Sequence, residues 1–206
     1  PGSKELMFLL QLVFYGDIIL PTPCWVSYAP QSRIIGRNIK YITTLFENKW
    51  RITPEQLEQF LINENDKYKP RLLILNYPGN PDGGTYFSDD LKHIAKIAEE
   101  YELIILSDEI YSNIIFDNLK FHSIAELPNM QERTIILDGF SKFFAMTGWR
   151  LGFSVTNPQL ATSFARWATN LISCTATFIQ DAGTVALKEP KEESLAMVHE
   201  FQARRD

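Results

Sequence analysis

Several features that mark particular classes of protein are scarce in this 206-residue sequence. It has two cysteines, Cys24 and Cys174, and three histidines, all far apart, so their spacing predicts neither a disulfide framework nor a metal site. The 20 basic residues form no run and are outnumbered by 25 acidic ones. This balance argues against nucleic acid or a membrane surface as a partner. No apolar run reaches the roughly 18 residues that a membrane span requires.

What is present favours a globular protein. Hydrophobic residues make up 45% of the chain, which is enough for one sizeable core. The sequence starts at Pro1 rather than at methionine, and we expect it to be a piece of a longer protein. The apolar segment 6–15 has no basic leader and is not typical of a signal peptide. Two isolated thiols favour a reducing compartment, and we expect the cytoplasm.

Short apolar runs alternate with amphipathic segments along the chain. The runs lie at 17–20, 71–75, 103–106 and 134–137, and each passes directly into a polar or proline-containing segment. Unbroken apolar runs of this length are expected of strands that are buried on both faces. The alternation therefore predicts an α/β fold with a largely parallel sheet.

Helix starts are marked by capping signals. Residues 53–56 (TPEQ) form a capping box with proline at the first helical position. Ser88 is predicted to cap a second helix, and Asn157, followed by proline, a third. Two more helices are predicted at about 176–188 and 191–205.

Ligands bind outside the carboxyl ends of the strands in such sheets, so polar residues just after the apolar runs are the candidates for chemistry. Asp108 follows the run 103–106. A buried carboxylate there is costly unless a cation meets it, so Asp108 is either a helix cap or an anion that awaits a positive ligand. The segment 76–84, after the run 71–75, is rich in Asn, Pro and Gly, which favour turns with or without a function.

Residues 138–153 hold few polar side chains among glycines and aromatics. Lys142 in an apolar setting would become a nucleophile, and Arg150 suits recognition of a phosphate or carboxylate. A lysine and an arginine that merely cover the core explain this segment equally well. Near the start, Gly2 and Ser3 precede an apolar helix and are placed to offer N–H groups to an anion. Trp25 either stacks on a flat ligand or is an ordinary core tryptophan.

In order and spacing, these segments resemble the class I/II aminotransferases, which are pyridoxal phosphate (PLP) enzymes of fold type I. The segments are Asn80-Pro81, 107–111 (SDEIY) and the highly specific 141–152 (SKFFAMTGWRLG). Residues 21–28 (PTPCWVSY) resemble the segment that bears the cofactor-stacking tryptophan in the aspartate aminotransferase branch.

The resemblance extends from residue 2 to about residue 190 and implies an architecture. It implies a three-layer α/β/α sandwich with a mostly parallel, mixed sheet. Residues 1–190 would be the PLP-binding large domain without its N-terminal segment. Residues 191–206 would begin the connection to a C-terminal small domain that lies outside the chain.

The resemblance also implies roles for single residues. Lys142 would attach the cofactor through its aldehyde and then act as general base, and Asp108 would pair with the protonated pyridine nitrogen. Asn80 and Tyr111 would hydrogen-bond the phenolic oxygen. Phosphate would be held by Arg150, Ser141, Gly2 and Ser3, with Trp25 stacked on the ring. The implied catalytic residues are Lys142, Asp108 and Tyr111, and the implied cofactor-binding residues are Gly2, Ser3, Trp25, Asn80, Asp108, Tyr111, Ser141, Lys142 and Arg150.

Two positions depart from the family pattern. Asp82 stands where threonine is common after Asn-Pro, and Gly139 stands where many members carry a phosphate-binding serine. Neither residue performs the chemistry, so we expect altered phosphate contacts rather than loss of function.

The implied reaction is ping-pong transfer of an amino group by a Schiff-base mechanism in a homodimer. The donor would be an L-amino acid, with aspartate as the first choice, and the acceptor a 2-oxo acid such as 2-oxoglutarate. The alternatives are another fold-type-I activity (β-lyase, aromatic or alanine aminotransferase) and a non-catalytic PLP-binding module. Because the small domain with its carboxylate-binding arginine is missing, we expect the 206 residues alone to turn over poorly.

Overall fold

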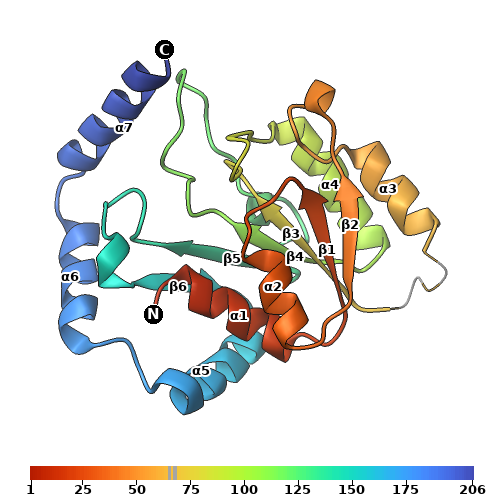
Figure 1. Ribbon diagram of the computed structural model, residues 1–206, viewed down its shortest axis with the longest axis horizontal. Coiled ribbons are helices and arrows are strands. Elements are labelled where there is room, and N and C mark those ends of the chain that lie inside the picture. Colours follow the sequence, from red (N-terminus) through yellow and green to blue (C-terminus); the bar gives the residue numbers. More distant parts are fainter. Residues whose placement is uncertain (65, 67–68) are drawn as a thin grey trace.

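A computed structural model describes residues 1–64, 66 and 69–206 of the chain. Within these residues, one sheet with the strand order β2-β1-β3-β4-β5-β6 forms the centre of the molecule (Figure 1). The parallel strands are β1 (Asp17–Thr22), β2 (Ile39–Thr43), β3 (Arg71–Asn76), β4 (Ile104–Asp108) and β5 (Thr134–Gly139). The edge strand β6 (Gly152–Val155) runs antiparallel to β5. The predicted α/β fold with a mostly parallel, mixed sheet is confirmed.

Helices cover both faces of the sheet and make three layers (Figure 1). One face carries α1 (Ser3–Val13), α2 (Tyr28–Ile34) and α5 (Pro158–Ile172). The other carries α3 (Pro54–Ile62) and α4 (Ser88–Glu100). Two further helices, α6 (Thr177–Lys188) and α7 (Glu192–Arg205), follow α5 along the outside of the molecule (Figure 1). No helix in the described residues combines the length and the apolar character that crossing a bilayer demands.

The predicted strands at 17–20, 71–75, 103–106 and 134–137 are confirmed as β1, β3, β4 and β5. The sequence patterns missed β2 and β6. Both are edge strands with mostly half-exposed side chains, and they contain no unbroken apolar run. An unbroken apolar run is expected only of strands that are buried on both faces, so a search for such runs does not find edge strands.

Two predicted helix starts are confirmed. In the capping box of α3, the Gln56 N–H donates to Thr53 Oγ1 at 3.2 Å and the Thr53 N–H donates to Gln56 Oε1 at 3.1 Å. At α5, Asn157 Oδ1 accepts the Leu160 N–H at 2.9 Å. Each side chain satisfies an N–H group that the first helical turn leaves without a partner.

The predicted cap at Ser88 is wrong. Ser88 is the first residue of α4, and Phe87 occupies the N-cap position. The Phe87 N–H donates to Asp90 Oδ2 at 3.4 Å, so the acidic side chain in the first turn accepts the N–H of the N-cap residue, which is a different group from the one that a capping serine would satisfy.

Candidate active site

The parallel strands β3, β4 and β5 bring their carboxyl ends to one edge of the sheet. Asn76 at the end of β3 lies beside Asp108 at the end of β4, and Asp108 lies beside Leu137 of β5. The segments that follow these strands carry Asn80, Tyr111 and Lys142. The topology therefore gathers side chains that are far apart in sequence.

Asp108 is a buried carboxylate, with 4% of its surface exposed. Its Oδ2 accepts a hydrogen bond from the Tyr28 hydroxyl at 2.7 Å, and its Oδ1 accepts a longer one from the Ile110 N–H at 3.4 Å. Asn76 Nδ2 donates to the Asp108 backbone carbonyl at 3.0 Å and fixes the strand end. No helix begins directly after Asp108, which excludes the helix-cap alternative.

Burial raises the pKa of Asp108 to about 6, against the hydrogen bonds from Tyr28 and Ile110 and the nearby charge of Lys142. A carboxylate in this setting is destabilised by the loss of water and gains from a cation placed against it. The burial and the raised pKa of Asp108 therefore agree with the second predicted role, that of an anion which binds a positively charged ligand.

Asn80, Tyr111 and Lys142 contact one another at the same edge of the sheet, and the charge of Lys142 acts on Asp108. Asn80 Nδ2 donates to the Tyr111 hydroxyl at 3.4 Å, and the Asn80 N–H donates to Asn76 Oδ1 at 2.8 Å. The Lys142 Nζ lies 5.4 Å from the centroid of the Tyr111 ring.

The expectation of a buried lysine is wrong for this structure. Lys142 lies in the turn after β5 and is exposed, because that turn stands at the open edge of the sheet and no described element covers it. Its neighbour Ser141 in the same turn is half-buried.

A second group of predicted residues meets at the start of α1. Gly2 has a φ of +83°, and a Cβ placed on it would lie 2.6 Å from Arg150 Nη2, so the guanidinium rests directly on the glycine. Arg150 Nη1 donates to the Thr147 carbonyl at 2.9 Å. A Cβ on Gly152 would lie 2.5 Å from the Ser3 nitrogen. Because Gly2 and Gly152 have no Cβ, the Arg150 guanidinium and the first N–H groups of α1 lie close together. Such a combination is a suitable binding site for an anion.

Trp25 contacts Tyr28, the hydrogen-bond partner of Asp108, and Lys4 in the first turn of α1. The Trp25 ring meets the Tyr28 ring edge to face, with 5.4 Å between the two centroids. The Lys4 Nζ lies 4.9 Å from the centroid of the Trp25 ring. Trp25 is half-buried rather than enclosed in the core.

The two departures from the family pattern have structural reasons. Asp82 Oδ2 accepts the Gly84 N–H at 2.8 Å and closes the turn between Gly79 and Gly84, a role that a carboxylate fills well. A Cβ on Gly139 would lie 2.9 Å from the Leu151 carbonyl oxygen, so the close pairing of β5 and β6 favours glycine there.

Sequence reasoning missed two residues of this region. Tyr28 is separated from Asp108 by 80 positions, and no local pattern predicts their hydrogen bond. Asp138 directly follows an apolar run, so the rule that selected Asp108 would have found it. Burial, with Glu109 and Asp108 nearby, raises the pKa of Asp138 to about 7, and its Oδ1 accepts the Gly139 N–H at 2.6 Å.

A sheet of this topology, with a buried aspartate, a tyrosine, an asparagine and a lysine at its carboxyl edge, defines the class of the protein. The family model for aminotransferase class I and II matches residues 1–206. The chain belongs to that family, and the predicted resemblance is confirmed.

Individual relatives agree with this assignment. The chain is 38% identical over 192 residues to the aromatic-amino-acid aminotransferase 2 of Thermococcus litoralis, covering 92% of this chain and 48% of the relative. It is 39% identical over 213 residues to the aspartate aminotransferase of Pinus pinaster, covering 100% of this chain and 42% of the relative. The structure of the aspartate aminotransferase from Rhizobium meliloti matches with a TM-score of 0.93 at 29% identity, over 100% of this chain and 51% of that one. The chain thus spans about half the length of the relatives it matches.

Proposed function

We propose that this chain is the cofactor-binding part of a PLP-dependent aminotransferase, which transfers an amino group from an L-amino acid to a 2-oxo acid by a ping-pong mechanism. The family uses PLP. The observation that carries the proposal is the buried carboxylate of Asp108, which stands within one cluster with Asn80, Tyr111 and Lys142. A plain scaffold gains nothing from a buried acid that lacks a close cation.

The residues present fit the cofactor at both of its charged ends. Asp108 would face the protonated ring nitrogen and keep it protonated, while Asn80 and Tyr111 would hold the phenolic oxygen. Arg150 and the N–H groups at Gly2 and Ser3 would offer positive charge to the phosphate. Ser141, which directly precedes Lys142 in the sequence, would offer its hydroxyl to the same phosphate. Bound PLP supplies an electron sink for the bonds at the substrate α-carbon.

Lys142 is assigned two tasks. Its exposed amine is accessible to the aldehyde of the cofactor, to which it would attach covalently. Once released by the incoming amino group, the same amine would carry the proton of the substrate α-carbon as a general base. Trp25 would cover one face of the ring, held at its angle by Tyr28.

Aspartate with 2-oxoglutarate remains the first choice of substrates, supported by relatives named aspartate aminotransferase at 31–39% identity. An aromatic donor is the second choice, since a relative of 38% identity is named for that activity. We further propose that the whole protein acts as a homodimer in the cytoplasm. Donor-dependent formation of glutamate by the whole protein, with aspartate and phenylalanine compared, tests the substrate choice.

The cofactor role of Lys142 is tested by a PLP titration followed by visible absorbance, borohydride reduction and peptide mapping. We expect an absorbance band of the attached cofactor and a reduced adduct on Lys142, both abolished in Lys142→Ala. Lys92→Ala is the matched control, because Lys92 is an exposed lysine that pairs with Asp89 on α4. An adduct spread over several lysines, or a band that survives in Lys142→Ala, would contradict the assignment.

A further inference from the structure

Tyr28 is the first residue of α2 and is almost fully buried, with 1% of its surface exposed. In the described part of the chain, its hydroxyl supplies the one side-chain hydrogen bond to the Asp108 carboxylate, at 2.7 Å. The same ring packs against the Trp25 ring in an edge-to-face pair. One side chain therefore contacts both a residue proposed to face the ring nitrogen of the cofactor and a residue proposed to cover the ring.

The hydroxyl is fixed in the role of donor. Burial, together with the neighbouring Asp108, raises the pKa of Tyr28 well above its usual range, so its proton stays in place over the whole working pH range. A hydrogen bond to the charged form of a buried carboxylate favours that form over the protonated one. Without this bond, only the longer contact from the Ile110 N–H would remain on the Asp108 oxygens.

We propose that Tyr28 is a positioning residue: its hydroxyl holds Asp108 in the orientation and in the charged form that a positively charged ring nitrogen requires. This inference rests on the proposed function for its purpose, although the contact between Tyr28 and Asp108 does not. Tyr28 itself touches neither the substrate nor the reacting atoms; it acts through Asp108 and, by its packing, through Trp25.

The surroundings of Asp108 set the size of the effect. Tyr28 on α2 and Lys142 after β5 favour the charged carboxylate, whereas Glu109 directly after β4 and Asp138 near the end of β5 oppose it. Because burial raises the pKa of Asp108 to about 6, the loss of one favourable partner lowers its charged fraction several-fold near pH 6 and little near pH 8. The effect of Tyr28 should therefore be large near pH 6 and small near pH 8.

The test compares Tyr28→Phe with the wild type by two measurements. In the cofactor-free protein, carbon-13 NMR of labelled aspartate follows the Asp108 carboxyl, and we expect its titration midpoint to rise by about one pH unit. In a PLP titration, the affinity of Tyr28→Phe should fall about fivefold at pH 6 but less than twofold at pH 8, which are the changes in charged fraction that a one-unit shift produces. A merely structural role would weaken binding equally at both pH values.

Tyr86→Phe is the matched control. Tyr86 is also buried, at 6% exposure, and its hydroxyl accepts the Ile52 N–H at 3.2 Å; within the described residues it makes no hydrogen bond to the Asp108 carboxylate. Removing this hydroxyl should lower stability as Tyr28→Phe does, but it should leave both the Asp108 midpoint and the pH dependence of binding unchanged.

An unchanged Asp108 midpoint in Tyr28→Phe, or an equal loss of affinity at both pH values, overturns the inference. If the wild type binds no PLP, the proposed function fails, while the midpoint in the cofactor-free protein still decides the role of Tyr28. If Tyr28→Phe does not fold, 3-fluorotyrosine at position 28 keeps the shape and strengthens the donor. The Asp108 midpoint should then move down, and a midpoint that stays in place counts against the inference.

Discussion

At the scale of single residues, the two acids at the strand ends make the protein sensitive to pH. Burial raises the pKa of Asp138 to about 7 and the pKa of Asp108 to about 6. The ordinary pKa of aspartate, which applies to the unfolded chain, is about 3.9. Folding therefore favours the protonated acids. The stability they allow is fully present below pH 4 and is lost as the pH rises through 6 and 7.

This argument predicts that Asp138→Asn stabilises the protein at high pH. Asparagine is neutral at every pH and keeps an oxygen that can accept the Gly139 N–H, as Asp138 does at 2.6 Å. In urea unfolding, the variant should exceed the wild type by on the order of 2 kcal/mol at pH 8 and match it near pH 4. Asp89→Asn should show no such gain, since Asp89 is exposed and its pKa is lowered by Lys92. An equal difference at both pH values would rule out the titration of Asp138 as its cause.

Single residues also show how far sequence reasoning reached. Asp108 was predicted because a strand end and its burial follow from the apolar run before it. The exposure of Lys142 was not predicted, because it depends on which elements cover the turn after β5, and no local sequence pattern contains that information. The contact of Tyr28 with Asp108 was missed for the same reason, since two elements 80 positions apart create it.

At the scale of secondary-structure elements, the contact between β6 and the start of α1 depends on Gly152. A Cβ there would lie 2.5 Å from the Ser3 nitrogen and 2.8 Å from the Gly2 carbonyl carbon, which are backbone atoms that cannot rotate away. Gly152→Ala should therefore push α1 from β6 and destabilise the protein by roughly 1–3 kcal/mol. It should also weaken PLP binding, because the N–H groups of Gly2 and Ser3 would move relative to Arg150.

Gly148→Ala is the matched control for this substitution. Gly148 lies in the same segment, has no positive φ, and a Cβ on it would meet no atom within 4 Å. Chemical unfolding and a PLP titration of both variants provide the measurement. Equal effects of the two substitutions would show that the close approach of β6 to α1 is not what requires glycine at position 152.

Elements were predictable where the signal is local. The capping box at Thr53 and the cap at Asn157 involve residues three apart, and both are present as predicted. The start of α4 was placed one residue too late, because Ser88 is a typical capping residue whereas Phe87, which occupies the N-cap position, carries no capping signal. The edge strands β2 and β6 are defined by their neighbours rather than by their own composition.

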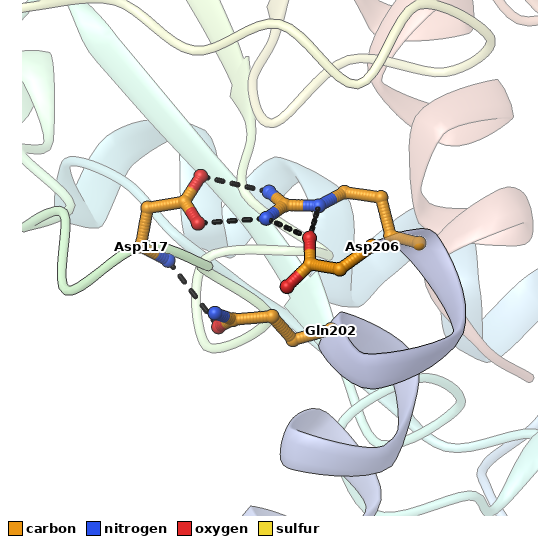
Figure 2. Close-up of polar contacts among 4 residues, drawn as sticks. Asp117, Gln202 and Asp206 are labelled. Carbon is orange, nitrogen blue, oxygen red and sulfur yellow. Dashed lines mark hydrogen bonds and ion pairs between the residues drawn. The ribbon is translucent and has the colours of Figure 1, made fainter.

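At the scale of the whole molecule, α7 contacts the loop after Tyr111 through polar bonds to Asp117. Arg205 donates from both terminal nitrogens to the carboxylate of Asp117, at 2.7 Å each, and the Asp117 N–H donates to Gln202 Oε1 at 3.3 Å. Figure 2 shows Asp117 facing the last turn of α7, which carries Gln202. Arg205 also lines, with Tyr111, a cavity of about 280 Å³. This contact ties the last turn of α7 to the loop that follows Tyr111.

The expected consequence is a local change without a global one. Arg205→Gln should speed amide hydrogen exchange in α7 and in residues 112–120, because it removes the bidentate pair and leaves only the longer Gln202 bond between them. The melting temperature should stay unchanged, since the pair is exposed and screened by water and salt. Arg204→Gln is the control: Arg204 pairs with Glu200 in its own helix at 2.8 Å and does not reach the loop.

A second experiment measures amide exchange in 1 M salt. Because salt screens the ion pair, the exchange rates of the wild type should rise to those of Arg205→Gln, whereas the rates of the variant should not change. If the loop 112–120 exchanges faster only in Arg205→Gln and in high salt, movement of α7 is coupled to the residues next to Tyr111. If exchange rises in α7 alone, the helix is merely anchored on a loop that is ordered without it, and the link between α7 and the site is refuted.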